Sequence, residues 1–203
     1  MIEAETAGGV LTLRIARPDK ANALTEGMLS DLAVAIERSA APTLVLTGAG
    51  TVFSAGADLA EVRDGSLATS PAWERLSGAV AAFRGLSVAA LNGSCAGGAM
   101  GMVLACDLRI AVPQAQFFYP VIRMGVLPQP SDPGRLRALI GPAMSKRILL
   151  TGAKLTAQEA LSCGLIDRIA EADLMAEAHA LIEPALAADP RQIAVIKTLI
   201  DGE

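Results

Sequence analysis

Short apolar segments mark the strands that this chain is expected to form. Between residues 10 and 15, the side chains of Leu11, Leu13 and Ile15 fall on one face of an extended chain, which is typical of a half-buried strand. The same pattern analysis predicts further short strands at residues 43–47, 88–91, 107–112 and 116–119.

Helical spacing of apolar residues separates these strands. Met28, Leu32 and Ile36 recur at that spacing after Thr25, a residue type that commonly caps a helix, and Pro42 ends the segment. We also predict helices in residues 73–83 and 99–105 and, beyond residue 134, in residues 135–140, 142–150, 156–162, 173–187 and 190–200. Strands that alternate with helices, followed by helices alone, predict an α/β core in residues 1–134 and a helical region in residues 135–203.

Composition narrows the class of protein. Hydrophobic residues make up 52% of the chain and charged residues 19%, which excludes an intrinsically disordered protein. The most apolar window, residues 97–106, is half the roughly 20 residues that a membrane-spanning helix needs, and residues 1–15 carry too many charges for a signal peptide. Three cysteines without CxxC spacing fit a reducing compartment, so we expect a cytoplasmic protein. Residues 64–71, rich in Gly, Ser and Thr, are expected to form a mobile linker.

Several kinds of chemistry are excluded by what the chain lacks. The net charge is −4 and the basic residues are scattered, so we expect no nucleic-acid partner. The single histidine, His179, falls off the apolar stripe of its helix and is expected to be solvated. One such histidine cannot build a multi-histidine metal site, and it is a poor base for a serine or cysteine nucleophile.

Two loops of small residues each follow a strand and precede a helix. They are residues 54–58, which lead into a short helix with Glu61 and Arg63, and residues 94–98. Such loops can present backbone N–H groups to a ligand, although a single one is usually only a tight turn. Two converging loops would supply the pair of donors that an oxyanion hole requires. The glycine spacing fits neither a dinucleotide fingerprint nor a phosphate-binding loop.

Four motifs together resemble the enoyl-CoA hydratase/isomerase (crotonase) family in their order and spacing. They are Arg-Pro-Asp-Lys-Ala-Asn-Ala-Leu at 17–24, Phe-Ser-Ala-Gly-Ala-Asp-Leu at 53–59, Asn-Gly-Ser-Cys-Ala-Gly-Gly at 92–98 and Ala-Cys-Asp at 105–107. Residues 150–152, 157–160 and 164–166 are similar to later signatures of that family. The resemblance extends over roughly residues 8–200.

The resemblance implies a crotonase-like spiral of ββα units, a helical trimerisation region and an acyl-CoA thioester substrate. Coenzyme A would be part of the substrate, so no separate cofactor is expected, and the assembly would be a homotrimer or a dimer of trimers. The N–H groups of Ala57 and Gly98 would hold the thioester oxygen and stabilise an enolate. The resemblance places the following residues against the ligand: Lys20, Ala21, Ala23, Ala55, Ala57, Asp58, Leu59, Gly97, Gly98, Pro120 and Val121.

The chain also departs from the family. The hydratases use two glutamates to add water, and the corresponding positions hold Gly101 and Val121. The nearest titratable residues are Asp132, either a replacement acid or a turn cap, and Tyr119, which could simply fill space beside the site. Family members continue further, into helices over the active site. With that C-terminal part shortened, we expect a more open site, a site covered by a neighbouring subunit, or a lost function.

Three functions are therefore compatible with the sequence. The first is a hydratase or isomerase that uses another acid such as Asp132. The second is a decarboxylase or related enolate former, in which Met100, Met102, Val121 and Met124 make a dry pocket. The third is a non-catalytic acyl-CoA-binding or assembly subunit.

Overall fold

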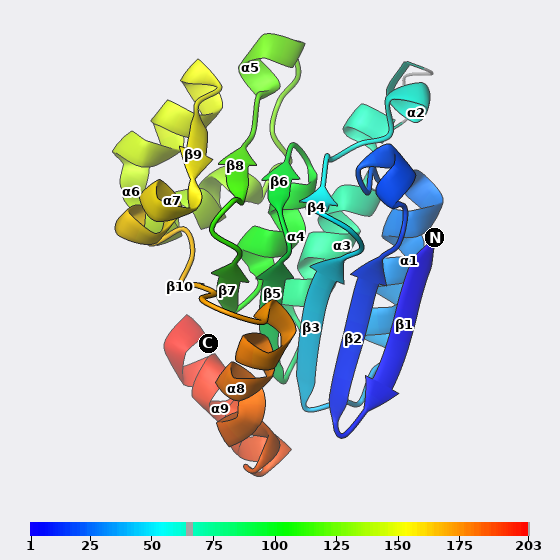
Figure 1. Cartoon of the computed structure of the whole chain (residues 1–203), viewed down its shortest axis with the longest axis vertical. Helices are drawn as coiled ribbons and strands as arrows, with labels where there is room; N and C mark the ends of the chain where they lie inside the picture. Colours follow the sequence, from blue (N-terminus) through cyan, green and yellow to red (C-terminus); the bar gives the residue numbers. More distant parts are fainter. Residues whose placement is uncertain (64–66, 203) are drawn as a thin grey trace.

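Two β-sheets form the centre of the molecule in the computed structural model, which describes residues 1–63 and 67–202 (Figure 1). The larger sheet has the strand order β1-β2-β3-β5-β7-β10, and its strands run parallel except for the β1–β2 hairpin. The bounds are β1 (Ile2–Ala7), β2 (Val10–Ile15), β3 (Thr43–Gly48), β5 (Leu86–Leu91), β7 (Leu108–Ala111) and β10 (Arg168–Ile169).

The smaller sheet has the strand order β4-β6-β8-β9. Its strands are β4 (Val52–Ser54), β6 (Ser94–Ala96), β8 (Gln116–Phe118) and the antiparallel β9 (Lys154–Thr156). Each of β4, β6 and β8 follows a strand of the larger sheet and precedes a helix, so the chain repeats a ββα unit. This is the crotonase-like spiral expected from the sequence.

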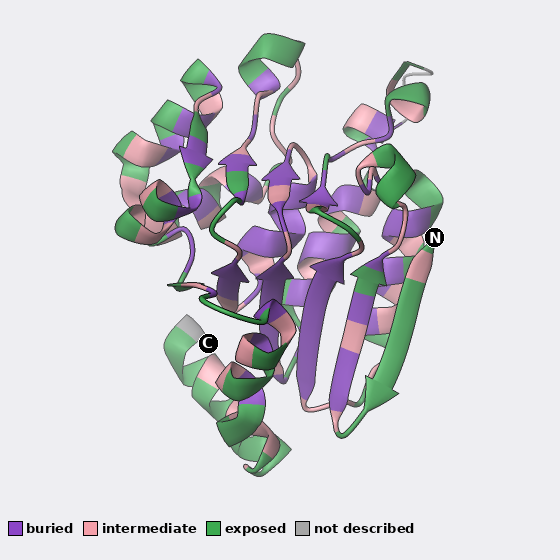
Figure 2. Ribbon diagram, viewed as in Figure 1, coloured by how far each residue is buried: buried purple, intermediate pink, exposed green. Residues whose placement is uncertain are grey.

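Helices cover both faces of the larger sheet. On one face lie α1 (Glu26–Glu37), α3 (Ala72–Ala81) and α4 (Ala99–Ala105), and on the other lies α8 (Leu174–Leu186). In β3, Leu44 and Leu46 pack toward α1 and α3 whereas Val45 packs toward α8, as the two-residue period of a strand requires. Figure 2 shows that β3 is consequently buried along its whole length.

Among the remaining helices, α7 (Ala157–Cys163) and α9 (Pro190–Asp201) begin at residues whose side chains cap them. The short helices α2 (Leu59–Arg63) and α5 (Val121–Met124) follow β4 and β8. Helix α6 (Asp132–Thr151) is interrupted at Gly141, whose φ of 72° lies outside the helical region, so the two predicted segments are one kinked element. Helix α7 begins with a capping box, and α9 begins at its cap Asp189.

Five strands and one packed turn differ from the sequence-based expectations. The structure adds β1, joined to β2 through Gly8 and Gly9, as well as β4, β9 and β10, and it makes part of the predicted 94–98 loop into β6. In the predicted linker, residues 64–66 lie outside the described residues. Residues Leu67–Thr69 form a 3₁₀ turn in which Leu67 is fully buried, and the Leu67 carbonyl accepts a hydrogen bond from Trp73 Nε1 at 2.9 Å. Residues Leu67–Thr69 of the predicted linker are therefore packed against the core beside α3, and the expectation of a mobile linker is wrong for them.

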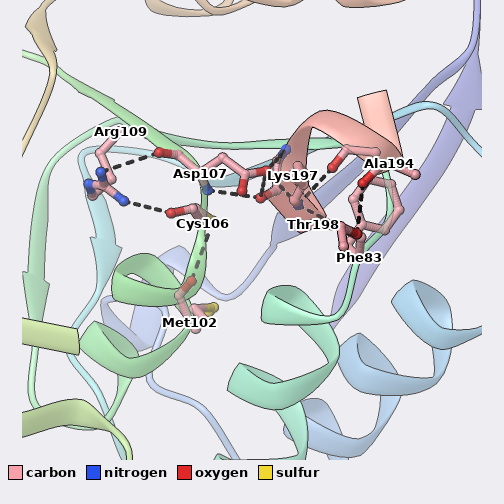
Figure 3. A network of polar contacts seen from close by, with 10 residues as sticks. Phe83, Met102, Cys106, Asp107, Arg109, Ala194, Lys197 and Thr198 are labelled. Atoms are coloured by element: carbon pink, nitrogen blue, oxygen red, sulfur yellow. Dashed lines mark hydrogen bonds and ion pairs between the residues drawn. The ribbon is translucent and has the colours of Figure 1, made fainter. Parts of the chain in front are cut away.

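Helix α9 is anchored to the core by one ammonium group (Figure 3). Lys197 Nζ donates to the carbonyls of Phe83 at 2.7 Å and Gly85 at 3.0 Å, and to Asp107 Oδ2 at 2.9 Å. Asp107 Oδ2 also accepts from the backbone and side chain of Ser87. The aspartate of the Ala-Cys-Asp motif therefore has a structural role. In the described part of the chain, no helix is both long and apolar enough to cross a membrane.

Candidate active site

A cavity of about 170 Å³ lies at the carboxyl ends of β4, β6 and β8. These three strands are parallel neighbours, so the segments that leave them meet at one edge of the smaller sheet, as in other open α/β sheets that bind ligands. The wall includes both small-residue loops and the start of α5. Larger surface hollows of about 680 and 450 Å³ lie beside α9 and beside α8, away from both loops.

The 17–24 segment is bound directly to the first loop. Leu24 N–H donates to the Gly56 carbonyl and Asp58 N–H donates to the Leu24 carbonyl, both at 2.8 Å, while Ala55 N–H donates to the Ala21 carbonyl at 2.9 Å. Two motifs that lie more than 30 residues apart in the chain are therefore adjacent in space. Their pairing fixes the position of the first loop.

A buried asparagine holds the turn of the 17–24 segment. The side chain of Asn22 has no exposed surface, and its amide donates to the carbonyls of Ala49 at 2.8 Å and Val52 at 2.6 Å. Asn22 Oδ1 accepts from the N–H of Arg17 at 2.9 Å. Ala21 and Asn22 both have positive φ, a strained conformation for residues with a side chain that these bonds stabilise.

Glycine allows the two loops to touch. A β-carbon added to Gly56 would lie 2.7 Å from the Ala96 carbonyl oxygen, and φ at Gly56 is +92°. A β-carbon on Gly98 would lie 3.1 Å from the ring of Trp73. Close approach of the two backbones thus requires a residue without a side chain at position 56 and leaves little room at position 98.

Ala57 and Gly98 carry backbone N–H groups that have no acceptor among the described residues. Both residues line the cavity, one from each loop. Unpaired backbone donors beside a cavity are rare in folded proteins, where such groups are normally hydrogen-bonded. This pair can therefore bind an oxygen atom of a ligand.

The other residues expected to contact a ligand divide into two groups. Those that line the cavity are Ala55, Leu59, Gly97, Pro120 and Val121, whereas Lys20, Ala21, Ala23 and Asp58 do not line it. Asp58 instead pairs with Arg17 at 2.5 Å and accepts from Ala60 N–H at 2.9 Å. The hydrogen bond from Arg17 is the main reason that the pKa of Asp58 is lowered. The Asp58 side chain thus holds the loop rather than facing the cavity.

Asp132 lies behind the cavity wall. Its side chain is fully buried, and Oδ2 accepts a hydrogen bond from the phenolic hydroxyl of Tyr119 at 2.9 Å. Oδ1 has no hydrogen-bond partner among the described residues, and Arg135 Nη1 is 3.8 Å away. Asp132 does not cap a turn, because its one hydrogen bond is to a side chain. Burial raises the pKa of Asp132 to about 6.

Tyr119 stands between Asp132 and the cavity that it lines. Its hydroxyl oxygen also accepts from Gln129 N–H at 3.3 Å, and burial raises its pKa. The sequence left two interpretations of this tyrosine open, a titratable group near the site or a residue that fills space beside it. The signal in the sequence for a chemical role was its position two residues before Val121, where the second glutamate expected from the resemblance is missing.

The two positions without glutamate differ in their surroundings. Val121 is nearly buried and lines the cavity, together with Met124 and Leu127. Gly101 lies inside α4 and does not line the cavity. Met100 and Met102 are likewise buried away from the cavity, so only part of the expected apolar pocket is formed by the methionines.

Other candidate residues lie elsewhere. Glu61 lies on α2, where its Oε2 accepts from Glu26 N–H at 2.8 Å at the start of α1. His179 is exposed on α8, as the sequence predicted. No group of three or more metal-ligating side chains occurs among the residues that the structure describes.

Comparisons with known proteins extend over nearly the whole chain. The sequence profile of a family described as enoyl-CoA hydratase/isomerase matches residues 5–202. The 2,3-dehydroadipyl-CoA hydratase of Escherichia coli (strain K12) is 34% identical over 178 residues, which cover 83% of this chain and 68% of that protein. An enoyl-CoA hydratase/isomerase structure from Pseudoalteromonas atlantica T6c superposes with a TM-score of 0.91 at 32% identity, covering 99% of this chain and 82% of the other. The structure of an enoyl-CoA hydratase from Bacillus anthracis superposes with a TM-score of 0.90 at 29% identity, covering 98% of this chain and 82% of the other.

Proposed function

The chain belongs to the enoyl-CoA hydratase/isomerase family, and on that premise we propose that it binds an acyl-CoA thioester between its two small-residue loops and stabilises the enolate of that thioester. The observation that carries the proposal is the pair of unpartnered N–H groups of Ala57 and Gly98 beside one cavity. Each such donor contributes on the order of 10²–10³ to the rate when charge develops on the oxygen.

The surroundings of the cavity support the same proposal. The acyl chain would lie against the apolar wall formed by Val121, Met124 and Leu127. The backbone at Lys20, Ala21, Ala23 and Asp58, outside the cavity, would contact the adenosine and pantetheine parts of coenzyme A, as in the family. No cofactor beyond the substrate's own coenzyme A enters the proposal.

Hydration is not the reaction that these residues favour. Adding water across a double bond requires groups that position and deprotonate it, and the family's two glutamates are replaced by Gly101 and Val121. Enolate formation by proton transfer does not require a water site. The second candidate is decarboxylation, which the apolar wall favours because loss of carbon dioxide itself generates the enolate.

A ligand comparison tests the oxyanion site without altering the protein. Calorimetry would measure the binding of butyryl-CoA and of S-butyl-CoA, a thioether that lacks only the carbonyl oxygen. Two hydrogen bonds of about 0.5–1.5 kcal/mol each predict that the thioester binds at least fivefold more tightly. Equal affinities would refute the role of Ala57 and Gly98. Failure of both ligands to bind would refute acyl-CoA binding altogether.

A panel of enoyl-, malonyl- and β-ketoacyl-CoA substrates, analysed by mass spectrometry, would then separate the candidate reactions. Conversion of a β,γ-enoyl thioester to its α,β isomer would support the proton-transfer reaction. Loss of carbon dioxide from malonyl-CoA would support decarboxylation. Binding without conversion of any member would show a non-catalytic binding subunit.

We also propose that the protein assembles as a trimer or a dimer of trimers. Helix α9 exposes four apolar side chains, those of Val195, Ile196, Leu199 and Ile200, and the mean hydropathy of the whole chain is +0.45. Light scattering at micromolar concentration tests this, and a monomeric mass would refute it.

A further inference from the structure

Tyr119 and Asp132 form the one buried carboxylate–phenol pair among the described residues, and it lies against the wall of the cavity. Tyr119 comes from the end of β8 and Asp132 from the first turn of α6. The side chain of Tyr119 is 3% exposed and that of Asp132 is not exposed. Asp132 does not line the cavity, and its hydrogen bond to Tyr119 connects it to a residue that does.

We propose that Tyr119 transfers a proton to and from the acyl chain, that Asp132 holds this proton during the reaction, and that the pair serves a 1,3-proton shift between β,γ- and α,β-unsaturated thioesters. The inference rests on the proposed function, because the enolate must be stabilised while the proton is held. Tyr119 would be the catalytic residue, and Asp132 would act through it.

The proton balance closes within the site. The phenolic oxygen of Tyr119 takes a proton from the α-carbon as its own proton passes to Asp132 Oδ2, 2.9 Å away. The electron pair of the broken C–H bond moves into the enolate, whose oxygen lies at the N–H groups of Ala57 and Gly98. In the second half, Tyr119 gives a proton to the γ-carbon and recovers one from Asp132. Neither a redox partner nor a water molecule is consumed.

The surroundings of Asp132 favour such a role over a structural one. A buried carboxylate oxygen without a donor, such as Oδ1, destabilises the fold, so burial of this group has a cost that packing alone does not explain. The titratable and charged groups near it are Tyr119, Arg135 at 3.8 Å, Glu74 on α3 and Cys95 on β6. Arg135 is the single cation among them, and its guanidinium makes its shortest bond, 2.7 Å, to Ser131 Oγ. The carboxylate therefore remains able to accept a proton.

The test uses Tyr119→Phe and Asp132→Asn, which remove one oxygen or one charge with little change in shape. Conversion of 3-hexenoyl-CoA to 2-hexenoyl-CoA would be followed by absorbance, and butyryl-CoA binding by calorimetry. We expect both variants to lose at least about 10²-fold in kcat while butyryl-CoA affinity changes less than threefold. Asp31→Asn, an exposed aspartate on α1, is the matched control and should retain full activity.

The outcomes separate this inference from the proposed function. If the unaltered protein does not bind butyryl-CoA, the proposed function fails. If it binds but does not isomerise 3-hexenoyl-CoA, or if Tyr119→Phe retains kcat, the inference on this pair fails.

Two further readouts distinguish proton storage by Asp132 from a purely structural role. In the unaltered protein, kcat should fall tenfold per pH unit at acid pH as Asp132 becomes protonated, and this fall should be absent from the residual activity of Asp132→Asn. In D₂O, the product should retain substrate hydrogen in part of the turnovers. Full deuterium incorporation in every turnover, or an identical pH profile in Asp132→Asn, would overturn the storage role.

Discussion

The carboxylate of Asp132 occupies the space that a side chain at position 101 would need. A β-carbon on Gly101 would lie 2.9 Å from Oδ1 and 3.2 Å from Oδ2 of Asp132. By the resemblance described above, the family's hydratases would carry a glutamate at the position of Gly101. In this chain a carboxylate reaches that position from α6, and a side chain added at position 101 on α4 would overlap it.

Gly101 and Asp132 should therefore be energetically coupled. Gly101→Ala alone should destabilise the protein by about 1–3 kcal/mol, because the new methyl group overlaps the carboxylate. In an Asp132→Ala background the same substitution should be harmless, which gives a coupling energy of about 1–3 kcal/mol in urea unfolding. Gly78→Ala in α3, where a β-carbon meets open space, is the control and should stabilise by about 0.5–1 kcal/mol. Additive effects at positions 101 and 132 would contradict the overlap.

Burial of Asp132 should make stability depend on pH. Its pKa is raised from 3.8 to about 6 in the folded protein, so the folded state binds the proton more tightly than the unfolded state. The contribution of Asp132 to the free energy of unfolding is therefore most favourable below pH 4 and is lost as the pH rises through 6. The loss amounts to about 3 kcal/mol.

Comparison with Asp132→Asn isolates this contribution, because the substitution removes the titrating carboxyl group at position 132 and no other. Between pH 4 and pH 7, urea unfolding should show that the unaltered protein loses stability relative to Asp132→Asn. If the difference in free energy of unfolding between the two proteins stays constant with pH, Asp132 titrates normally.

A glutamate at position 121 should introduce hydration chemistry. Val121 lines the cavity, so Val121→Glu would place a carboxylate beside the acyl chain without disturbing Asp132. We expect crotonyl-CoA hydration in the unaltered protein to be at least about 10⁴-fold below an ordinary rate of about 10 s⁻¹. Val121→Glu should raise it by at least tenfold, as loss of enoyl absorbance would show. Val121→Gln, of the same size but without an acid, should not.

Lys197→Met should loosen helix α9. The ammonium group donates three hydrogen bonds, two of them to carbonyls with no other donor among the described residues. Hydrogen bonds to charged groups contribute about 1.5–3 kcal/mol, so we expect a loss of about 2 kcal/mol of stability in thermal or urea unfolding. Arg191→Met, on the exposed side of the same helix, should change stability by less than about 0.5 kcal/mol. Equal effects of the two substitutions would show that the anchor is unimportant.

Local pattern was enough to predict the longer elements. Strand β2 has the expected bounds and α1 begins after its predicted cap Thr25, because a period of two residues or of 3.6 residues, with a capping residue, is a property of the segment itself. Strands β6, β9 and β10 contain only two or three residues. Such strands form because a partner strand is present in the folded protein, which no local pattern records.

The candidate site divides in the same way. Ala57 and Gly98 could be expected beside a ligand because their motifs resemble those of the family in order and spacing. The Tyr119–Asp132 bond could not, because it depends on how the first turn of α6 packs against the end of β8. Asp132, between Ser131 and Pro133, has the local appearance of a capping residue, and only tertiary packing turns its carboxylate toward Tyr119.

The Lys197 anchor also bears on the order in which the protein folds. Its hydrogen bonds join residues 114 and 112 positions apart, so a long loop must close before they form. The ββα units can pair through much shorter loops and are expected to assemble first. The anchor is then absent from the folding transition state, and its loss should accelerate unfolding while leaving the folding rate unchanged. Lys197 would thereby act as a latch that sets the lifetime of the native state.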